Sequence, residues 1–218
     1  MLVLSWNLFH GRSVPDAPRP LLARFAEQLA AWEWDVALLQ EVPPWWPPAL
    51  GRACGASART ALTSRNWLLA LTRPLARRRP DLVKSWGGGA NALLVRGEGV
   101  TEHRLRTLRA WPERRVVHGV RLERGWWVCN VHAQAHSEAR ARADVALAAA
   151  TAAGWSAGAP VVLGGDLNTR VPSAPGFAHV AGHGVDHVFA RLANAAAPGR
   201  TLDRGPLSDH LPVLAEVA

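Results

Sequence analysis

The stretch APVVLGGDLN (159–168) joins a short apolar run to a polar end. Its valine and leucine residues are consecutive rather than alternating with polar ones, which is typical of a strand that is buried on both faces. The run opens into a loop that carries Asp166 and Asn168. A buried strand that ends in an acid and an amide indicates a sheet protein with its polar chemistry at the edge of the sheet.

The same pattern occurs along the rest of the chain. Further strands are predicted at LVLSWN (2–7), DVALLQEV (35–42), WWVCNVHA (126–133), GVDHVFA (184–190) and the closing PVLAEVA (212–218). The polar residues where these strands meet their loops are Asn7, Glu41, His132, Asp166, Asn168, Asp186 and the pair Asp209 and His210. Because carboxylates that approach one another need a cation between them, and the set contains no thiol, we expect a site for Mg²⁺ or Mn²⁺.

Helices are fewer. The apolar residues of PLLARFAEQLAAW (20–32) have helical spacing. A second helix is expected to begin after Ser137, a good N-cap residue, and to run through alanines to Ala153, where Gly154 would end it. The apolar segment WLLALT (67–72) is compatible with a strand.

The order of these elements predicts the fold class. RVVHGVRL (115–122) and the strand at 126–133 are separated by a short glycine-containing turn, which predicts a hairpin, whereas other strands are separated by helices. Hairpins and crossovers together indicate mixed α/β sheets rather than a parallel one. With no internal repeat and no linker, residues 1–218 are expected to form a single domain of two packed sheets flanked by helices.

Composition narrows the cellular setting. Hydrophobic residues make up 49% of the 218 residues, which is enough for a sizeable core. No apolar run is long enough to span a membrane, and the N-terminal segment lacks the features of a signal peptide, so a cytoplasmic protein is expected. The two cysteines, Cys54 and Cys129, are far apart and are expected to be buried thiols. Nothing implies a protein partner, and a monomer is expected.

The charge points to an anionic partner. The net charge is +8, and 24 of the 25 basic residues are arginine, which binds phosphate through two parallel hydrogen bonds. This favours nucleic acid or another phosphate ester as substrate, although an arginine-rich composition also results from a GC-rich genome. The segment PPWWPP, with Trp45 and Trp46, either displays stacking surfaces for bases or packs in the core or a lid.

Several of these segments resemble one family. SWN, LLQEV, NVH, GGDLN, VDHVF and LSDHLPV, in this order between residues 5 and 213, resemble the endonuclease/exonuclease/phosphatase superfamily. The resemblance implies a four-layered α/β sandwich of the DNase I type. It also implies a Mg²⁺- or Mn²⁺-dependent hydrolase of phosphate esters.

The resemblance also implies roles for the polar strand ends. Glu41 would be the principal metal ligand, with Asn7 beside it and Asp209 assisting. Asp166 would orient or deprotonate the attacking water, and Asn168 would hold the scissile phosphate. Asp186 would hydrogen-bond the imidazole of His210 and keep it cationic against the phosphate.

Other candidates have weaker support. His132 is a catalytic candidate, but the acid that would pair with it in DNase-like relatives is missing, since Asp81 is the only carboxylate between residues 42 and 97. A phosphate-binding role for His132 is equally compatible with the pattern. Substrate-binding candidates are Asn91 in GGGAN and the pair Arg114 and Arg115. A zinc site at His132 and His136 is disfavoured, because their spacing suits a helix and they follow a strand.

Three functions remain to be compared. The first is a phosphodiesterase or nuclease that acts on nucleic acid. The second is a phosphatase or phosphodiesterase for a small or lipid phosphate, and the third is a non-catalytic nucleic-acid-binding module, which would be expected to have lost site residues. A serine hydrolase is disfavoured, because the one G-x-S-x-G segment, GWSAG (154–158), follows the predicted alanine-rich helix and is not the strand-to-helix elbow that this motif requires.

Overall fold

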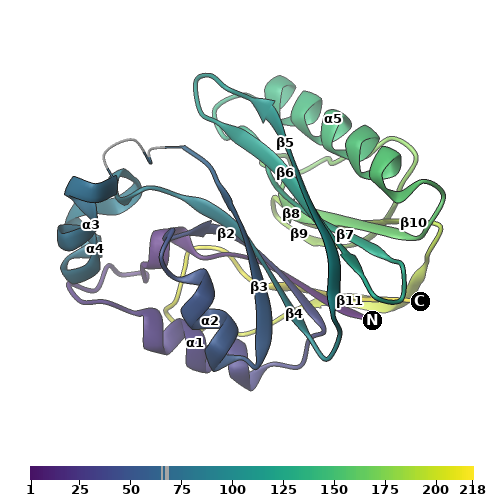
Figure 1. Cartoon of the computed structure of the whole chain (residues 1–218). Helices are drawn as coiled ribbons and strands as arrows, with labels where there is room; N and C mark the ends of the chain where they lie inside the picture. Colours follow the sequence, from purple (N-terminus) through teal and green to yellow (C-terminus); the bar gives the residue numbers. More distant parts are fainter. Residues whose placement is uncertain (65, 67–68) are drawn as a thin grey trace.

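The protein is a sandwich of two β-sheets with helices on both outer faces. The computed structural model describes residues 1–64, 66 and 69–218. In these ranges the chain forms two six-stranded sheets that pack face to face, with α1 and α2 outside one sheet and α5 outside the other (Figure 1). This is the four-layered α/β sandwich expected from the sequence.

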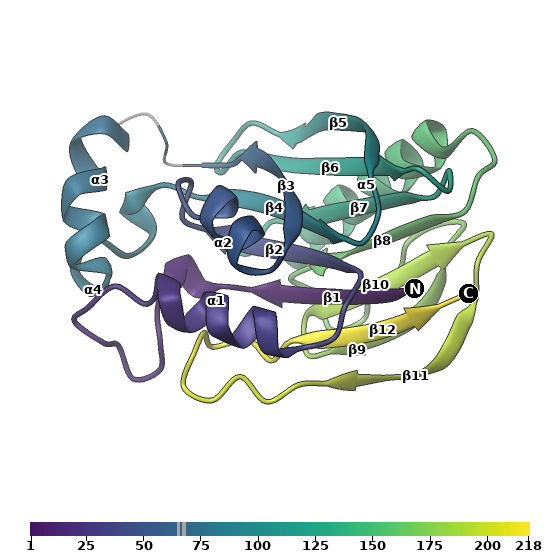
Figure 2. The same cartoon turned by 60° about the horizontal axis from the view of Figure 1, so that its bottom comes forward.

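The first sheet contains both ends of the chain. Its strands, in spatial order, are β11 (Ala195–Thr201), β12 (Val213–Val217), β1 (Leu2–Asn7), β2 (Val36–Val42), β4 (Ala90–Arg96) and β3 (Ala56–Leu62). β1 is parallel to β2 and antiparallel to β12. Figure 2 shows the N- and C-termini close together at the end of the sheet opposite α3 (Leu69–Arg78) and α4 (Pro80–Val83).

The second sheet positions much of the candidate site. Its strands, in spatial order, are β5 (Val100–Arg109), β6 (Arg115–Leu122), β7 (Trp127–His132), β8 (Val161–Asp166), β10 (Asp186–Arg191) and β9 (Ala178–His183). β6 and β7 form the expected antiparallel hairpin, and β7 is parallel to β8. The mixture of parallel and antiparallel pairs confirms the predicted mixed sheets.

Alternation along the strands builds three core layers. In β1, Leu4 and Trp6 face the outer helices, whereas Val3 faces the second sheet. Phe25 of α1 (Leu22–Ala31) packs on Trp6 with ring centroids 5.1 Å apart. A central cluster of mainly valine, leucine and alanine fills the space between the sheets, and a third cluster lies under α5 (Glu138–Ser156).

A buried polar link joins the two sheets close to the rim. Gln40 of β2 donates from Nε2 to Oδ1 of Asn130 in β7 at 2.8 Å. The amide of Asn130 in turn donates to the carbonyls of Leu39 and Ala92, both at 2.9 Å. Because buried amides are costly unless paired, this network favours one relative position of the sheets.

Two predicted elements differ from the structure. Residues 69–72 begin the helix α3 (Leu69–Arg78) instead of a strand, and Trp67 and Leu68 lie outside the described residues. Leucine, alanine and arginine are good helix formers, so an apolar run of them suits a helix as well as a strand.

The other difference is the end of α5. Ser137 caps this helix as predicted, accepting a hydrogen bond from the amide of Arg140 at 3.4 Å, but Gly154 lies inside the helix. The helix ends at Ser156, after which Ala157 adopts a left-handed conformation.

The remaining elements are short. They are η1 (Phe9–Gly11), α2 (Pro47–Ala53), α4 (Pro80–Val83) and η2 (Lys84–Gly87). Cys54 and Cys129 are free and buried, as predicted. Among the described helices, none combines the length and apolar character needed to cross a bilayer.

Candidate active site

Strand register brings three of the expected site residues together. His132 at the end of β7 pairs with Asp166 at the end of β8, and Asp166 pairs with Asp186 at the start of β10. The antiparallel direction of β10 explains why a strand start lies beside two strand ends. Three chemically active side chains therefore occupy neighbouring positions at one edge of the second sheet.

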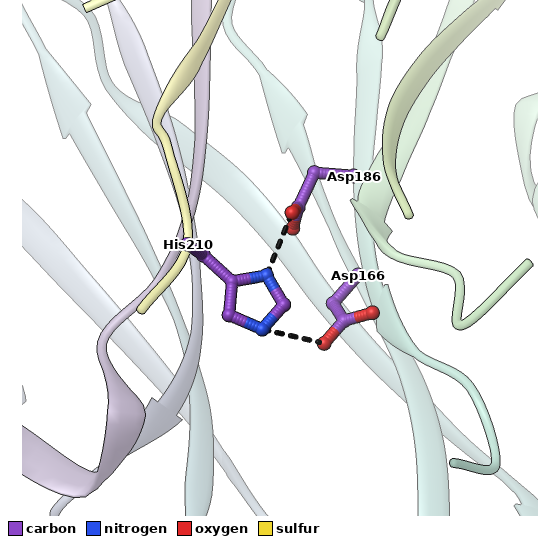
Figure 3. A group of neighbouring side chains, drawn as sticks. All are labelled: Asp166, Asp186 and His210. Atoms are coloured by element: carbon purple, nitrogen blue, oxygen red, sulfur yellow. Dashed lines mark hydrogen bonds and ion pairs between the residues drawn. The ribbon is translucent and has the colours of Figure 1, made fainter. Parts of the chain in front are cut away.

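The carboxylate of Asp166 is the centre of this group. Its Oδ2 atom lies 2.9 Å from Nδ2 of Asn7, 3.4 Å from Nε2 of His132 and 3.8 Å from Nε2 of His210. Asn7 belongs to the first sheet, so the site spans both sheets. Figure 3 shows His210 between Asp166 and Asp186, with one ring nitrogen directed at each carboxylate.

The sequence of β8 allows this close approach. Gly165 has φ of +144°, and a Cβ atom there would lie 1.8 Å from the carbonyl oxygen of Val131. Only glycine fits at that point, because any side chain would overlap the neighbouring strand. The glycine of GGD thus lets β8 pass close to β7 immediately before Asp166.

His210 is held by its loop as well as by its ring. Its backbone amide donates to Ser208 Oγ at 3.1 Å, and that hydroxyl donates to the carbonyl of Asn7 at 2.6 Å. The indole of Trp6 donates to the carbonyl of His210 at 3.1 Å. The loop before β12 is therefore fixed to the end of β1.

The imidazole of His210 carries a positive charge at neutral pH. Burial opposes the charge, but the hydrogen bond to Asp186, with Nδ1 and Oδ2 2.7 Å apart, and the negative charges of Asp186, Asp166 and Asp209 outweigh it. Together they raise the pKa of His210 to about 9.

His132 has the opposite charge state. Burial lowers its pKa well below the ordinary value, and the positive charges of Arg115 and His210 lower it further. The ring is therefore neutral at pH 7. Its Nε2 atom therefore lies 3.4 Å from Oδ2 of Asp166 as part of a neutral ring rather than of an imidazolium.

Asp166 itself titrates near neutrality. Burial raises its pKa to about 7, and the charge of Asp186 adds to the effect, against the opposing influence of His210 and Asn7. A carboxylate with this pKa accepts and releases protons readily at physiological pH.

A second group of side chains lines a narrow polar hollow next to Asp166. Glu41, His10, Arg115 and His132 face this hollow. Glu41 interrupts β2 with a φ of +50°, and its Oε2 atom lies 3.2 Å from Nε2 of His10. A non-glycine residue in this region of φ is strained, and such residues concentrate at functional sites.

Arg115 supplies a fixed positive charge to the hollow. The side chain is buried, pairs with Glu113 and donates to Oε1 of Gln134 at 3.4 Å. Burial lowers its pKa, while Glu113, Asp166 and Glu41 oppose the change, and arginine remains charged in proteins.

Some predicted residues lie in different surroundings from the rest. Arg114 is exposed, whereas Arg115 faces the hollow. Asn91 is buried in β4, with its amide 3.5 Å from the carbonyl of Val116 in the other sheet, and it is not among the residues that line the hollow. His136 is exposed on a separate surface from His132, and Asp81 pairs with Arg79.

Asn168 is fixed close to Asp166. Its backbone amide donates to Oδ1 of Asp166 at 3.0 Å, and its side-chain amide donates to the carbonyl of Ala133 at 2.9 Å. The residue has φ of +49°, a second strained position at the rim. Asp209 is exposed, with Oδ1 3.8 Å from Nε2 of His210.

His10 was not identified from the sequence as a site residue. It follows Asn7 by three positions, in a turn that the apolar pattern does not predict. Its left-handed φ of +54° turns the chain back toward Glu41. The sequence did contain one indication of this role: His10 comes just after a strand end that already carries the candidate ligand Asn7.

The donor set fits a hard divalent cation. Ligand atoms of Asp166, Asp186 and His210 all lie within 4.8 Å of one another. Oδ1 of Asp186 is buried and has no hydrogen-bond partner within the described part of the chain. Because a protonated imidazole cannot bind a metal, the carboxylate and amide oxygens around the rim are the suitable ligands, and such oxygens suit Mg²⁺ or Mn²⁺.

Comparison with known proteins agrees with this geometry. The family model described as the Endonuclease/Exonuclease/phosphatase family matches residues 4–210. No curated protein sequence matches the chain.

Solved structures with the same fold cover the whole chain. An endonuclease/exonuclease/phosphatase from Beutenbergia cavernae has a TM-score of 0.75 and 20% identity, covering 100% of this chain and 71% of that one. TDP2 from Caenorhabditis elegans has a TM-score of 0.68 and 17% identity, covering 99% and 73%. The mannosyl-6-phosphatase Bt3783 from Bacteroides thetaiotaomicron has a TM-score of 0.67 and 14% identity, covering 100% and 99%. With the family model spanning nearly all of its length, the chain belongs to the endonuclease/exonuclease/phosphatase family of metal-dependent phosphoesterases.

Proposed function

We propose that this protein is a Mg²⁺- or Mn²⁺-dependent phosphodiesterase that cleaves nucleic acid. The observation that carries the proposal is the setting of Asp166, a buried carboxylate with a pKa of about 7 between the charged His210 and the neutral His132. Such a group can accept a proton from water while a neighbouring cation binds the phosphate.

The metal would be held by oxygen ligands. Glu41 is the principal candidate, with Asn7 at the end of the neighbouring strand β1 and Asp209 next to His210. When bound, a divalent cation neutralises charge on the phosphoryl oxygens. The strained backbone at Glu41 supports this assignment, because it aims the carboxylate into the hollow.

The protein side chains supply the remaining chemistry. Asp166 orients the attacking water and takes its proton. The imidazolium of His210 and the guanidinium of Arg115 stabilise the negative charge that accumulates on the phosphoryl oxygens. Asn168, fixed beside Asp166, is the candidate amide for the scissile phosphate.

Asp186 and His132 have supporting roles in this proposal. Asp186 holds His210 in its charged form through the 2.7 Å hydrogen bond. His132 is neutral, so it serves as a hydrogen-bond donor to the phosphate or to Asp166, and not as an imidazolium acid. The missing DNase-like acid partner for His132 is consistent with that role.

The substrate class follows from charge and from the relatives. A net charge of +8 favours a polyanion, and arginine dominates the basic residues. A small phosphomonoester is the second candidate, because the chain is as similar to a mannosyl-6-phosphatase as to TDP2. A purely binding module is disfavoured, since every polar strand end of the expected set is present.

An activity panel tests the proposal. Single-stranded DNA, duplex DNA, RNA, a simple phosphodiester and a sugar phosphate are each incubated with Mg²⁺, with Mn²⁺ and with excess EDTA. We expect hydrolysis of a nucleic acid that EDTA abolishes. Full activity in EDTA would contradict the metal requirement, and hydrolysis of the sugar phosphate alone would establish the second candidate instead.

The variant Glu41→Gln tests the metal ligand. A neutral amide is a poor ligand for a hard cation, so we expect at least a roughly hundredfold loss of turnover with an unchanged circular dichroism spectrum. Glu27→Gln is the matched control, because Glu27 lies exposed on α1, where its carboxylate forms a 3.7 Å surface ion pair with Arg24. Wild-type turnover in Glu41→Gln would place the metal elsewhere.

A further inference from the structure

A larger cavity lies beside the polar hollow. It has a volume of about 410 Å³ and is lined by residues of η1, α1, α2, α3, α4 and η2 together with the loops between them. His10 lines both spaces, and Gly88 of the cavity is followed directly by Gly89 of the hollow. A molecule with its phosphate near Glu41 can therefore extend into the cavity.

The helices that form this cavity stand at the active end of the fold. Figure 2 shows α3 and α4 beside the end of the sheet at which β1 terminates, and that end carries Asn7. The volume is within the range of ordinary small-molecule sites. Its position next to the metal ligands makes it a site for part of the substrate.

Trp45 gives the cavity an aromatic wall. The two tryptophans of PPWWPP face different ways: Trp46 is buried against Phe25, with ring centroids 5.4 Å apart, whereas Trp45 is half-buried and lines the cavity. The guanidinium groups of Arg73 and Arg77 lie 5.9 Å and 5.8 Å from the centre of the Trp45 ring. An indole in such a position is a stacking surface for a planar group.

The rim of the cavity is positively charged. Arg52, Arg77 and Lys84 are among its lining residues, and the described lining includes no carboxylate. Lys84 is also the only lysine in the chain. An aromatic wall next to cations that have no carboxylate beside them in the described lining complements a planar base that carries a phosphate. A plain hydrocarbon chain has no anionic group that could pair with these cations.

We propose that this cavity binds one nucleotide unit of the substrate next to the scissile phosphate, with its base against Trp45 and its outer phosphate at Arg52, Arg77 and Lys84. The inference rests on the proposed function, because it assumes that a phosphodiester binds at the hollow. It adds a preference for a base on one side of the cleaved bond.

Binding without turnover tests the cavity directly. Calorimetric titrations in EDTA compare a 5′-phosphorylated dinucleotide with ribose 5-phosphate, which has no base. We expect the dinucleotide to bind at least about tenfold more tightly, and Trp45→Leu to remove most of that difference. Trp155→Leu is the matched control, because Trp155 is half-buried in α5 on the other sheet.

Two further variants keep the test decisive. Trp45→Phe retains a ring and is expected to bind with intermediate affinity, which separates stacking from loss of folding. Arg77→Gln is expected to lower the affinity for the dinucleotide severalfold and to reduce the salt dependence of binding. Arg142→Gln, at an exposed side chain on α5, is expected to change neither. Equal affinity of the two ligands, or unchanged binding in Trp45→Leu, would overturn the proposal.

Two esters separate this inference from the proposed function. Thymidine 5′-(4-nitrophenyl phosphate) carries a base, and methyl 4-nitrophenyl phosphate does not. Equal kcat/KM for both, together with equal binding, would disprove the nucleotide cavity and leave the phosphodiesterase intact. The opposite result is that neither ester is hydrolysed, while the dinucleotide still binds more tightly than ribose 5-phosphate and Trp45→Leu still removes that difference. This result would support the nucleotide cavity and disprove the phosphodiesterase function. Tighter binding of an alkyl phosphodiester than of the dinucleotide would assign the cavity to a lipid substrate instead.

Discussion

The strand end that carries His132 and the loop that carries His210 flank the same carboxylate but hold their imidazoles in opposite charge states. Both rings direct Nε2 toward Oδ2 of Asp166, at 3.4 Å and 3.8 Å. His210 has a carboxylate partner at 2.7 Å on its other nitrogen, and its pKa rises to about 9. His132 is buried beside Arg115, no carboxylate among the described residues pairs with its other nitrogen, and its pKa falls.

The difference shows that the charge state of a histidine at this site is set by its surroundings and not by its residue type. Burial disfavours charge on both rings, and Asp186 reverses the outcome for one of them. In the proposed mechanism, one histidine therefore supplies a positive charge to the phosphate and the other supplies a hydrogen bond.

Removal of the shared carboxylate is expected to have the largest effect. Asp166→Asn leaves both histidines without their common carboxylate and removes the proposed general base. We expect turnover to fall by about 10² to 10⁴, the range for a positioned general base. Steady-state kinetics at saturating metal measures this loss, and Asp203→Asn, at an exposed acid, is the control. Turnover within a few fold of wild type would mean that Asp166 is not the base.

The two histidines are expected to differ in importance. His210→Gln removes the positive charge that is proposed to face the phosphate, so we expect a loss of roughly 10²-fold in kcat. His132→Gln removes a neutral hydrogen-bonding group, for which a loss of about tenfold is expected. Parallel kinetics of the two variants at one pH compares them, and the reverse order would contradict the assignment of charge.

Asp186→Asn is expected to change the pH dependence of the activity more than its maximal rate. With the carboxylate present, the imidazolium of His210 persists up to a pKa of about 9. Without it, burial lowers that pKa, so activity that requires the charged ring should decline at lower pH on the alkaline side. The midpoint of the alkaline limb measures the shift, while the Mg²⁺ concentration for half-maximal activity stays nearly constant. A large rise in that concentration with an unshifted limb would make Asp186 a metal ligand.

The buried strands and their polar ends were predictable because their signals are local. The continuous apolar run before Asp166 and the hairpin at 115–133 need only a few neighbouring residues to be recognised. The run at 67–72 lacks that information, because its residues suit either a helix or a strand, and the part from Leu69 onward is helical.

Features set by distant contacts were not predictable. Trp45 and Trp46 share the same proline-rich segment, and only packing against Phe25 makes one of them core and the other a cavity wall. The contact between His10 and Glu41 depends on a left-handed turn that brings separate strand ends together. The opposite pKa shifts of His132 and His210 likewise depend on Asp186 and Arg115, which lie far from them in the sequence or on other strands.

Nuclear magnetic resonance of histidine-labelled protein tests the central claim most directly. Nitrogen-15 spectra of the metal-free protein, assigned with His132→Gln and His210→Gln, report which ring nitrogens carry protons as the pH is raised from 5 to 10. We expect His210 to be doubly protonated at pH 7.5 and to titrate near pH 9, and His132 to be neutral at pH 7.5, because burial lowers its pKa. A neutral His210 or a charged His132 at pH 7.5 would contradict the account.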